Sequence, residues 1–533
     1  PSRGLGDVYK RQFYKYYKAD DRQAYADVMA NINKRFGDLS LSANIGGSFT
    51  QTYYDERGFQ GGLKDMSNVF SLYNMTTTLD KDTYPIESGY KQRTNSIFAS
   101  VEIGWKSMLY MTLTGRNDWD SALINTEQSS FFYPSIGLSG VISEMVKLPK
   151  AITYLKVRGS FASVGAPIPK NLSSNKTYEW DPATSQWKLQ TYRPLPKLYP
   201  ERTNSWEAGL NAKFFNNSLS LEVTWYKANT RKQTFQVPLS GTAVYATMYA
   251  QSGNIENKGM EFSLGYNKSW GDFSWNSNLT FSFNKNKIVE LLDDAVDDEG
   301  NHYSLNEIDK GGIGSAKVIL RKGGSMGDMY VTNRLKRDNE GNVYIDKASQ
   351  NVKKEDIKNS DEFIHIGSVL PKSNLGFRND FSYKGISLGF MLAARFGGIV
   401  ISPTQAVMDQ FGVSKVTALA RDNEGVPVNN GKVDPQTYYT EVGGISGLMS
   451  NYVYSATNVR LQELSVGYSL PAKWFNNKCN LSLSITGHNL WMIYNKAPFD
   501  PEATASTGTY YQGVDYFMQP SLRSWGFNVK IQF

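Results

Sequence analysis

The last ten residues of the chain, Ser524 to Phe533, alternate between polar and apolar side chains without interruption. Because successive side chains of a β-strand point to opposite faces, this segment has one apolar and one polar face. Similar segments recur along the chain, a pattern typical of transmembrane β-barrels, whose outward residues face lipid and whose inward residues face water. We therefore predict an all-β, antiparallel transmembrane barrel, ending in a strand with the apolar residues Trp525, Phe527, Val529, Ile531 and Phe533.

The overall composition is compatible with such a barrel. No run of about 18 apolar residues is present, so the sequence predicts no transmembrane helix. The net charge of +7 comes from 57 basic and 50 acidic residues. No basic cluster stands out along the sequence, so we predict no nucleic-acid partner. Cys479 is the single cysteine, which excludes an internal disulfide and a cysteine-based metal cage.

Seven hairpins and one final strand can be assigned, which gives fifteen strands. Tight turns rich in Asn, Asp and Gly are expected within most hairpins, and long connections between them. Short turns at one end and long loops at the other are typical of outer-membrane barrels. The predicted strands are Asp27–Phe36, Leu39–Thr50, Gln92–Gly104, Ser107–Asn117, Tyr133–Ser143, Ile152–Ala162, Asn204–Phe215, Ser218–Asn229, Ile255–Trp270, Asp272–Asn284, Lys372–Tyr383, Ile386–Phe396, Thr457–Leu470, Lys478–Leu490 and Arg523–Phe533.

The two ends of the chain lead to further expectations. Residues Pro1–Gln12 fit neither the strand pattern nor a secretory signal, and we expect a non-native leader there. Residues 13–533 are then the C-terminal part of a barrel. Its first strand runs from the loop side into a short turn, whereas a complete barrel starts and ends on the short-turn side with an even number of strands. An odd number of strands is therefore expected upstream, and seven more would give 22.

Several segments, in order and spacing, resemble the SusC/RagA family of TonB-dependent outer-membrane transporters. Leu113–Leu123 (LTGRNDWDSAL) resembles a strand followed by the family's Arg-x-Asp loop. Ala166 departs from the family's usual Asn, and Trp119-Asp120 interrupts the usual small residues. The other similar segments are Phe132–Gly140, Leu155–Ala166, Pro200–Lys213, Asn254–Leu264, Ile366–Gly376, Asn458–Pro471, Gly487–Leu490 and Asp500–Glu502.

The resemblance implies a 22-stranded barrel around an N-terminal plug, which this chain does not contain. It also implies a SusD-like surface lipoprotein as partner and a TonB-binding segment, again outside this chain, that connects to TonB-ExbB-ExbD. Members of this class import glycans, or sometimes peptides, across the outer membrane of Bacteroidetes. The resemblance implies no catalytic residues and no enzyme activity.

Acidic loop segments allow two interpretations. Asp338-Asn339-Glu340-Gly341, with Asp346 further on, partly matches a loop in which carboxylates coordinate Ca²⁺. The same residue types also form ordinary β-turns in solvated loops. We expect turns, and we keep Asp338, Glu340 and Asp346 as a weak metal-site hypothesis without any other cofactor.

Aromatic residues in the predicted loops could stack on sugar rings, with Asn or Asp nearby to bind the hydroxyl groups. Loop packing and contact with a lipoprotein are the competing interpretations. A surface glycan-binding protein or hydrolase on a soluble β-sandwich is the alternative to the transporter, and it would pack the apolar strand faces together. The candidate ligand-binding residues are Trp180, Trp187, Tyr245, Tyr249, Tyr510 and Tyr511.

Overall fold

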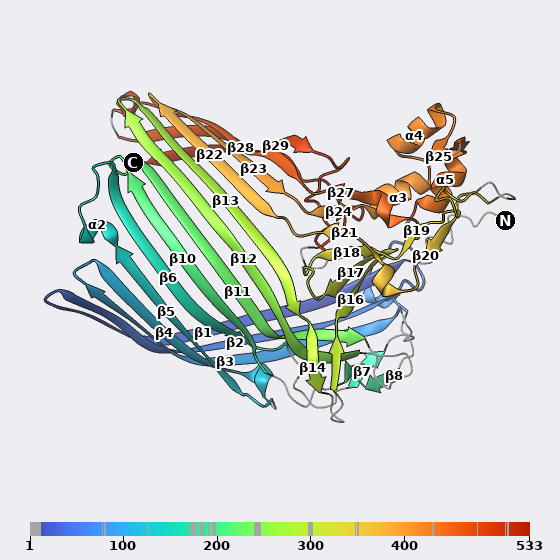
Figure 1. The fold of residues 1–533 in the computed structure, drawn as a ribbon, viewed down its shortest axis with the longest axis horizontal. Helices are drawn as coiled ribbons and strands as arrows, with labels where there is room; N and C mark the ends of the chain where they lie inside the picture. Colours follow the sequence, from blue (N-terminus) through green and yellow to red (C-terminus); the bar gives the residue numbers. More distant parts are fainter. Residues whose placement is uncertain are drawn as a thin grey trace.

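One antiparallel sheet of fifteen strands dominates the computed structural model (Figure 1). Each strand pairs with the preceding and the following strand of the sheet in chain order, so all fifteen predicted strands are confirmed. A two-residue strand, β9 (Tyr192–Arg193), pairs in parallel with β12. The wall strands are β1 (Phe13–Phe36), β2 (Leu39–Gly62), β3 (Tyr84–Trp105), β4 (Leu109–Asp120), β5 (Ser130–Val141), β6 (Ile152–Ala166), β10 (Glu201–Phe214), β11 (Leu219–Pro238), β12 (Thr247–Trp270), β13 (Phe273–Glu290), β22 (Ser373–Tyr383), β23 (Ile386–Phe396), β28 (Asn458–Ser469), β29 (Asn480–Asn495) and β30 (Ser524–Gln532).

The structure describes residues 12–76, 78, 82–124, 126–169, 172, 178–181, 186–189, 192–193, 199–238, 247–296, 302–346, 348, 351–428, 431–476, 478–506, 508 and 511–532. Within these ranges, no helix is long and apolar enough to cross a membrane.

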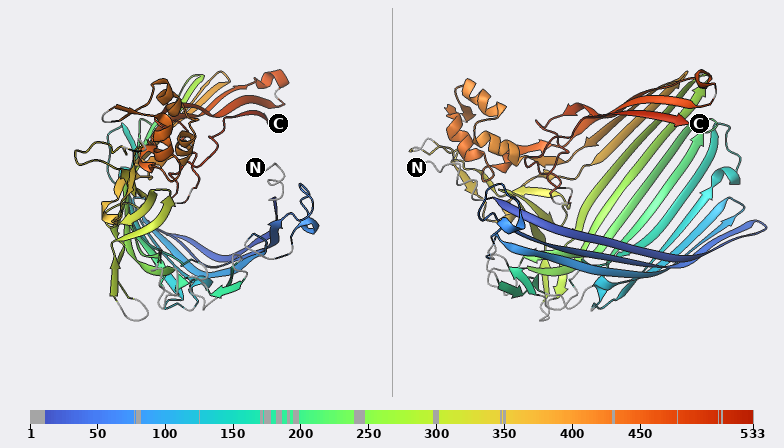
Figure 2. Two further views of the ribbon diagram at one scale, coloured as in Figure 1. Left: turned by 90° about the vertical axis from the view of Figure 1, so that its right-hand side faces the viewer. Right: turned by 180° about the vertical axis from the view of Figure 1, so that it is seen from behind.

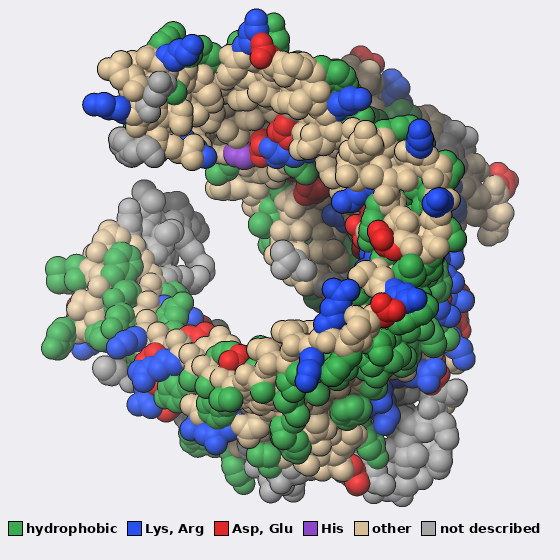
Figure 3. All heavy atoms as spheres, turned by 90° about the vertical axis from the view of Figure 1, so that its left-hand side faces the viewer, with side chains coloured by type: hydrophobic (Ala, Val, Ile, Leu, Met, Phe, Trp, Pro, Cys, Tyr) green, Lys and Arg blue, Asp and Glu red, His purple; other side chains and the backbone are tan. Residues whose placement is uncertain are grey.

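The wall forms an open, C-shaped trough with β1 and β30 at its two edges (Figure 2). Its outer face carries large apolar side chains that remain exposed (Figure 3). Trp225 is 42% exposed and Phe527 is 68% exposed, because no second sheet packs on this face among the described residues. The sandwich alternative is therefore wrong, and the apolar face is the one that a barrel turns towards lipid.

Short turns join the strands at one end of the wall, as the sequence predicts. Gly37 and Gly271 adopt positive φ angles of 59° and 58° in the turns β1–β2 and β12–β13. Lys384 and Gly385 do the same between β22 and β23, with φ angles of 47° and 87°. Glycine accepts this conformation without a steric penalty, which explains its use in these turns.

Several strands are much longer than the sequence pattern predicts. The predicted loop Gln51–Lys91 is wrong at both ends, because β2 continues to Gly62 and β3 begins at Tyr84. The alternation of apolar and polar residues weakens where a strand leaves the lipid, whereas the backbone ladder continues without it. The Arg-x-Asp segment is corrected for the same reason, since Arg116 and Asp118 lie within β4 and not in a loop.

The long connections build a compact lobe at the other end of the wall (Figure 1). Its main core consists of fully or almost fully buried side chains such as Val318, Leu320, Met329, Ile401 and Met449. Helix α2 (Ile142–Met145) lies in a connection at the short-turn end. The elements in the long connections are β7 (Tyr178–Asp181), β8 (Gln186–Leu189), β14 (Leu292–Val296), β15 (His302–Leu305), β16 (Glu307–Ile313), β17 (Ala316–Arg321), β18 (Asp328–Val331), β19 (Asn333–Leu335), β20 (Lys354–Asp356), β21 (Ile364–Ser368), β24 (Ile399–Ile401), α3 (Pro403–Gln410), α4 (Lys415–Asp422), β25 (Val426–Val428), β26 (Gly431–Val433), α5 (Pro435–Val442) and β27 (Val453–Ser455).

Candidate functional site

The concave inner face of the wall carries mostly small polar side chains. On β13, Ser274, Asn276 and Thr280 share this face, opposite the apolar Trp275 and Leu279. Register pairing continues the pattern across the sheet, for example from Thr280 to Gly376 on β22. Against this background of small residues, a few arginines and carboxylates stand out in three clusters.

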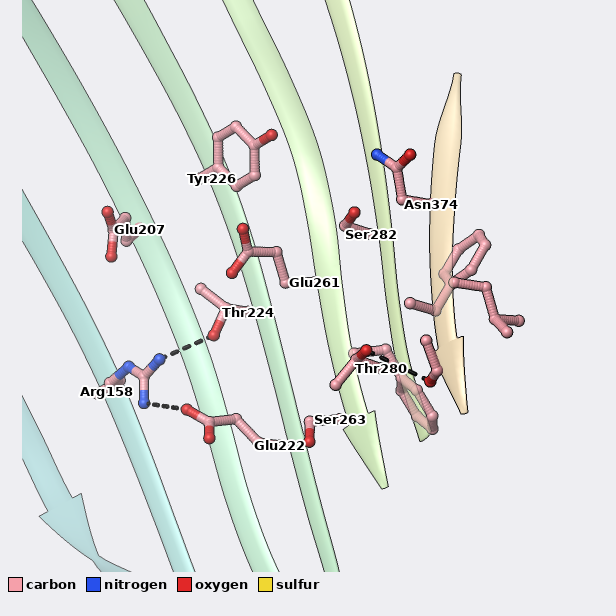
Figure 4. A pocket seen from close by; sticks show the side chains of 14 residues that line it. Arg158, Glu207, Glu222, Thr224, Tyr226, Glu261, Ser263, Thr280, Ser282 and Asn374 are labelled. Carbon is pink, nitrogen blue, oxygen red and sulfur yellow. Dashed lines mark hydrogen bonds and ion pairs between the residues drawn. The ribbon is translucent and has the colours of Figure 1, made fainter. Parts of the chain in front are cut away.

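The central cluster lies in a pocket of about 720 Å³ on the inner face of β6, β10, β11, β12, β13 and β22 (Figure 4). Arg158 of β6 reaches across β10 to β11. Its Nη1 donates to Glu222 Oε1 at 2.9 Å and to Asn211 Oδ1 at 2.9 Å, while Nη2 donates to Thr224 Oγ1 at 2.8 Å. The guanidinium therefore ties three neighbouring strands together.

A glycine makes this crossing possible. Gly209 is the register partner of Arg158, and a Cβ at that position would lie 2.6 Å from the Arg158 Nε. Any larger residue would push the guanidinium away from Glu222. The pocket also contains Glu207 and Glu261, which form no ion pair with the described residues and leave the site with a carboxylate excess.

Two similar clusters lie on other parts of the inner face. On β4, Arg116 Nε is 2.7 Å from Asp118 Oδ1, and its Nη2 donates to Ser96 Oγ at 2.6 Å. On β22, Arg378 binds Asp380 at 2.9 Å and Glu463 of β28 at 3.3 Å. The three clusters thus place arginine–carboxylate pairs at intervals around the concave wall.

Two of these clusters are accessible to solvent, whereas Asp118 in the third is buried. The side chains of the Arg158–Glu222 pair are 37% and 46% exposed, and those of Arg378–Asp380 are 45% and 42% exposed. Exposed ion pairs add about 0–1 kcal/mol to stability, and the backbone ladder already holds the strands together. Their charges are therefore available to a molecule inside the trough.

A different arginine fixes the connection between β29 and β30. The side chain of Arg460 on β28 is 4% exposed and binds Asp500 Oδ1 and Glu502 Oε2, both at 3.0 Å. Burial by itself would raise the pKa of Asp500, but hydrogen bonds from Ser521, the Glu502 backbone amide and Arg460 together hold this pKa below its usual value.

Comparison with known proteins agrees with this geometry. Residues 3–315, more than half of the chain, match the family described as TonB dependent receptor-like, beta-barrel. The chain belongs to this family. As a TonB-dependent receptor barrel it is an outer-membrane protein and not an enzyme.

Individual receptors are similar over about half of their own length. TonB-dependent receptor P3 of Formosa agariphila is 26% identical over 94% of this chain and 51% of the receptor. TonB-dependent receptor SusC of Bacteroides thetaiotaomicron is 23% identical over 82% of this chain and 43% of that protein. The RagAB peptide transporter structure superposes with a TM-score of 0.72 at 18% identity, covering 97% of this chain and 55% of that one, and so shares its fold.

The structure brings two of the predicted aromatic residues together in a loop, whereas Tyr249 lies on wall strand β12 and not in a loop. Trp180 on β7 is the register partner of Trp187 on β8, and Trp187 is 67% exposed. Tyr249 instead packs against a small apolar cluster that includes Leu123 and Phe131. The Tyr511 hydroxyl donates to the Lys310 carbonyl at 2.9 Å. Tyr245 and Tyr510 lie outside the described residues, so a sugar-binding role for this set stays a prediction.

The predicted metal-site residues form turns of the lobe. Asp338 Oδ1 accepts the backbone amides of Asn342 at 2.8 Å and Glu340 at 3.0 Å. The bonds from Asn342 hold the pKa of Asp338 below its usual value. Asp346 accepts the amide of Ala348 in a separate turn. Among the described residues, no group of three acidic, His or Cys side chains could hold a metal ion. Ca²⁺ binding stays an untested prediction.

Sequence reasoning missed the inner-face clusters. Arg158 and Arg116 both fall in segments that the family resemblance had marked, but no role was assigned to them. The available signal was the phase of the alternation, since each arginine lies on the polar face of its strand together with Ser160 or with Thr112 and Thr114. Asp118 is only two residues from Arg116, within the same motif. The partner of Arg158 could not be identified, because Glu222 is 64 residues away and meets it only through the strand register.

Proposed function

We propose that this chain forms the substrate-conducting wall of an outer-membrane TonB-dependent importer of oligosaccharides or peptides. The chain spans about half the length of the curated relatives that it matches, so the complete importer includes further segments. The observation that carries the proposal is the concave polar face, with its solvent-accessible arginine–carboxylate clusters.

The clusters suit a pathway in which contacts must be made and released. A half-exposed ion pair can exchange its partner for a group of a plug or a passing substrate at little net cost, because both states keep the charges solvated. Glu207 and Glu261, which form no ion pair within the described residues, offer additional acceptors for hydroxyl or amide groups. A buried apolar lining would not bind such polar molecules.

Partners follow from the same proposal. A SusD-like surface lipoprotein would cover the loop end of the wall, and TonB-ExbB-ExbD would act through the plug of the complete importer. Trp187, at the loop end, supports an oligosaccharide substrate, since an exposed aromatic face can stack on a sugar ring.

Uptake by cells tests the function directly. The full-length gene is deleted from its host and restored on a plasmid, and growth is measured on a panel of oligosaccharides and peptides. We expect growth on at least one member to depend on the gene and to stop with a proton uncoupler. Growth that is unchanged by the deletion on every member would contradict the importer proposal.

Two variants separate the wall from the loops. We expect combined Glu207→Gln and Glu261→Gln to slow uptake several-fold while leaving the amount of protein in the outer membrane unchanged. Asp361→Asn combined with Glu362→Gln, at two exposed positions between β20 and β21, removes the same charge and serves as the matched control. Equal uptake by both variants would show that the inner pocket has no part in transport.

A further inference from the structure

The outer face of the wall carries an unusual row of like charges near the loop end. Lys227 of β11 is the register partner of Lys258 on β12, which in turn is the partner of Lys285 on β13. Side chains of direct partners in adjacent antiparallel strands lie on the same face and close together. The row also includes Trp206 of β10, which is exposed and contacts Phe161 with the two rings tilted and their centroids 4.7 Å apart.

The next two rows towards the loops add more cations. Lys287 is the partner of Glu256, and Arg202 is the partner of Arg231. We call these six residues the outer cationic band: Arg202, Lys227, Arg231, Lys258, Lys285 and Lys287.

The band is poorly neutralised by the protein itself. Glu256 is shared between Lys227 and Lys258, with Oε–Nζ distances of 3.0 and 3.1 Å. Glu290, the partner of Asn254 beyond a β-bulge, forms no ion pair within the described part of the chain. Arg202 donates to the Phe132 carbonyl, and the other three cations contact no carboxylate among the described residues. Like charges placed directly opposite each other repel, so a bound external anion would reduce the repulsion among these cations.

The height of the band indicates where that anion comes from. Phe273 and Lys285 are twelve residues apart on β13, about 40 Å along the strand. At a typical barrel tilt of about 45° this corresponds to about 28 Å, close to the roughly 25 Å height of an apolar band. Below the lysine row, the same face of β13 carries the apolar Leu279, Phe281 and Phe283. The lysines therefore begin where the lipid tails end.

The loop-end side of this apolar band is the outer leaflet, since long loops are extracellular in such barrels. Headgroups at this level contact the band directly, and Trp206 beside Lys227 has the position of an interfacial aromatic residue. We propose that the outer cationic band binds the phosphate groups of an anionic lipid of the outer leaflet. The pocket beside Arg202 and Arg231 has a volume of about 290 Å³ and is also lined by Asn204, Lys232 and Glu201, whose carboxylate accepts the Thr234 amide. This pocket offers one such phosphate a defined binding position.

Binding of bisphosphorylated lipid A to the full-length protein in uncharged detergent tests the proposal, with native mass spectrometry as the readout. The band variant combines Lys227→Gln, Lys258→Gln and Lys285→Gln. The matched control combines Lys106→Gln, Lys147→Gln and Lys150→Gln, which removes the same charge at the short-turn end. Heat-modifiable migration on a gel shows that each variant folds.

Each cation near an anionic surface contributes roughly fivefold in affinity, so we expect the band variant to bind on the order of 100-fold more weakly. The control should bind like wild type, and lipid A without phosphates should bind all three proteins equally. If the band variant does not fold, the pair Lys285→Gln and Lys287→Gln replaces it, with a loss of roughly 25-fold expected.

Three outcomes would overturn the proposal. Equal lipid A binding by the band and control variants would show that the cations have no role. Displacement of lipid A by an equal concentration of inorganic phosphate would identify a site for a free anion. Loss of a co-purifying surface lipoprotein with unchanged lipid A binding would identify a protein-docking surface. None of these outcomes depends on whether the importer proposal holds.

Discussion

The wall and the lobe of this barrel protein are stabilised in opposite ways. In the lobe, residues such as Val318, Leu320 and Met329 are completely buried, as in a soluble domain. In the wall, the large apolar residues of the outer face stay exposed in the isolated chain, and the inner face is polar. The wall therefore depends on its backbone ladder and on surrounding lipid, whereas the lobe supplies its own apolar core.

This difference shows where a charged residue is structural and where it is free to act. Arg460 is buried and satisfies two carboxylates where the wall meets the β29–β30 connection, so its loss must leave charges unpaired. Arg378 makes similar contacts on the open inner face, where water can replace them. An arginine is thus structural where it is buried and available to other molecules where it is exposed.

The largest effect is expected from Arg460→Ala. Removing one partner of a buried ion pair costs about 3–5 kcal/mol, since Asp500 would remain buried without its cation. We expect faster backbone hydrogen exchange across residues 496–523 of the full-length protein in detergent. Unchanged protection in this connection would show that Arg460 does not hold it.

Truncation of one leucine in each region sharpens the comparison. Leu320→Ala empties a fully buried position of the lobe and should cost about 2–5 kcal/mol. Leu388→Ala, on the outer face of β23, replaces a large side chain in contact with lipid by a smaller one. It should lower the free energy of unfolding by about 0.5 kcal/mol. Limited proteolysis of the lobe measures the effect of Leu320→Ala. The temperature at which the barrel unfolds, read from its migration on a gel, measures the effect of Leu388→Ala. Equal costs would remove the distinction between the two regions.

Acidification should weaken the Arg460 contact. The pKa of Asp500 is lowered in the folded protein, so its contribution is complete above the unfolded pKa of about 3.9 and is lost as the pH falls through the folded value. We expect hydrogen exchange in residues 496–523, corrected for the intrinsic pH dependence, to be constant from pH 7 to about pH 4 and to rise below it. Asp500→Asn should abolish this pH dependence.

Among the arginine variants, the smallest effect is expected from Arg378→Ala. Its ion pairs are half exposed, so the thermal stability of the full-length barrel should change by less than about 1 kcal/mol. A loss as large as that of Arg460→Ala would mean that the inner-face clusters are structural, which would weaken the case for a role in transport.

The sequence predicts the wall well because alternation is a local property. For example, β22 ends at Tyr383 and β23 runs from Ile386 to Phe396, and all three positions are the predicted ones. The far ends of β1 and β12 were missed, since their backbone pairing continues after the apolar period has faded. The Arg158 cluster and the cationic row depend on register between strands, which the sequence leaves open because each turn and bulge shifts it.

Strand length has a mechanical consequence. β1 and β2 are each 24 residues long and pair in an unbroken register, which makes a ribbon about 80 Å long. A strand needs only about 9–11 residues to cross a bilayer, so more than half of this ribbon rises beyond it as a stiff collar. Cargo arriving from outside would enter a walled vestibule well before it reaches the level of the lipid. A force applied to the rim would be transmitted along the two paired strands towards the membrane.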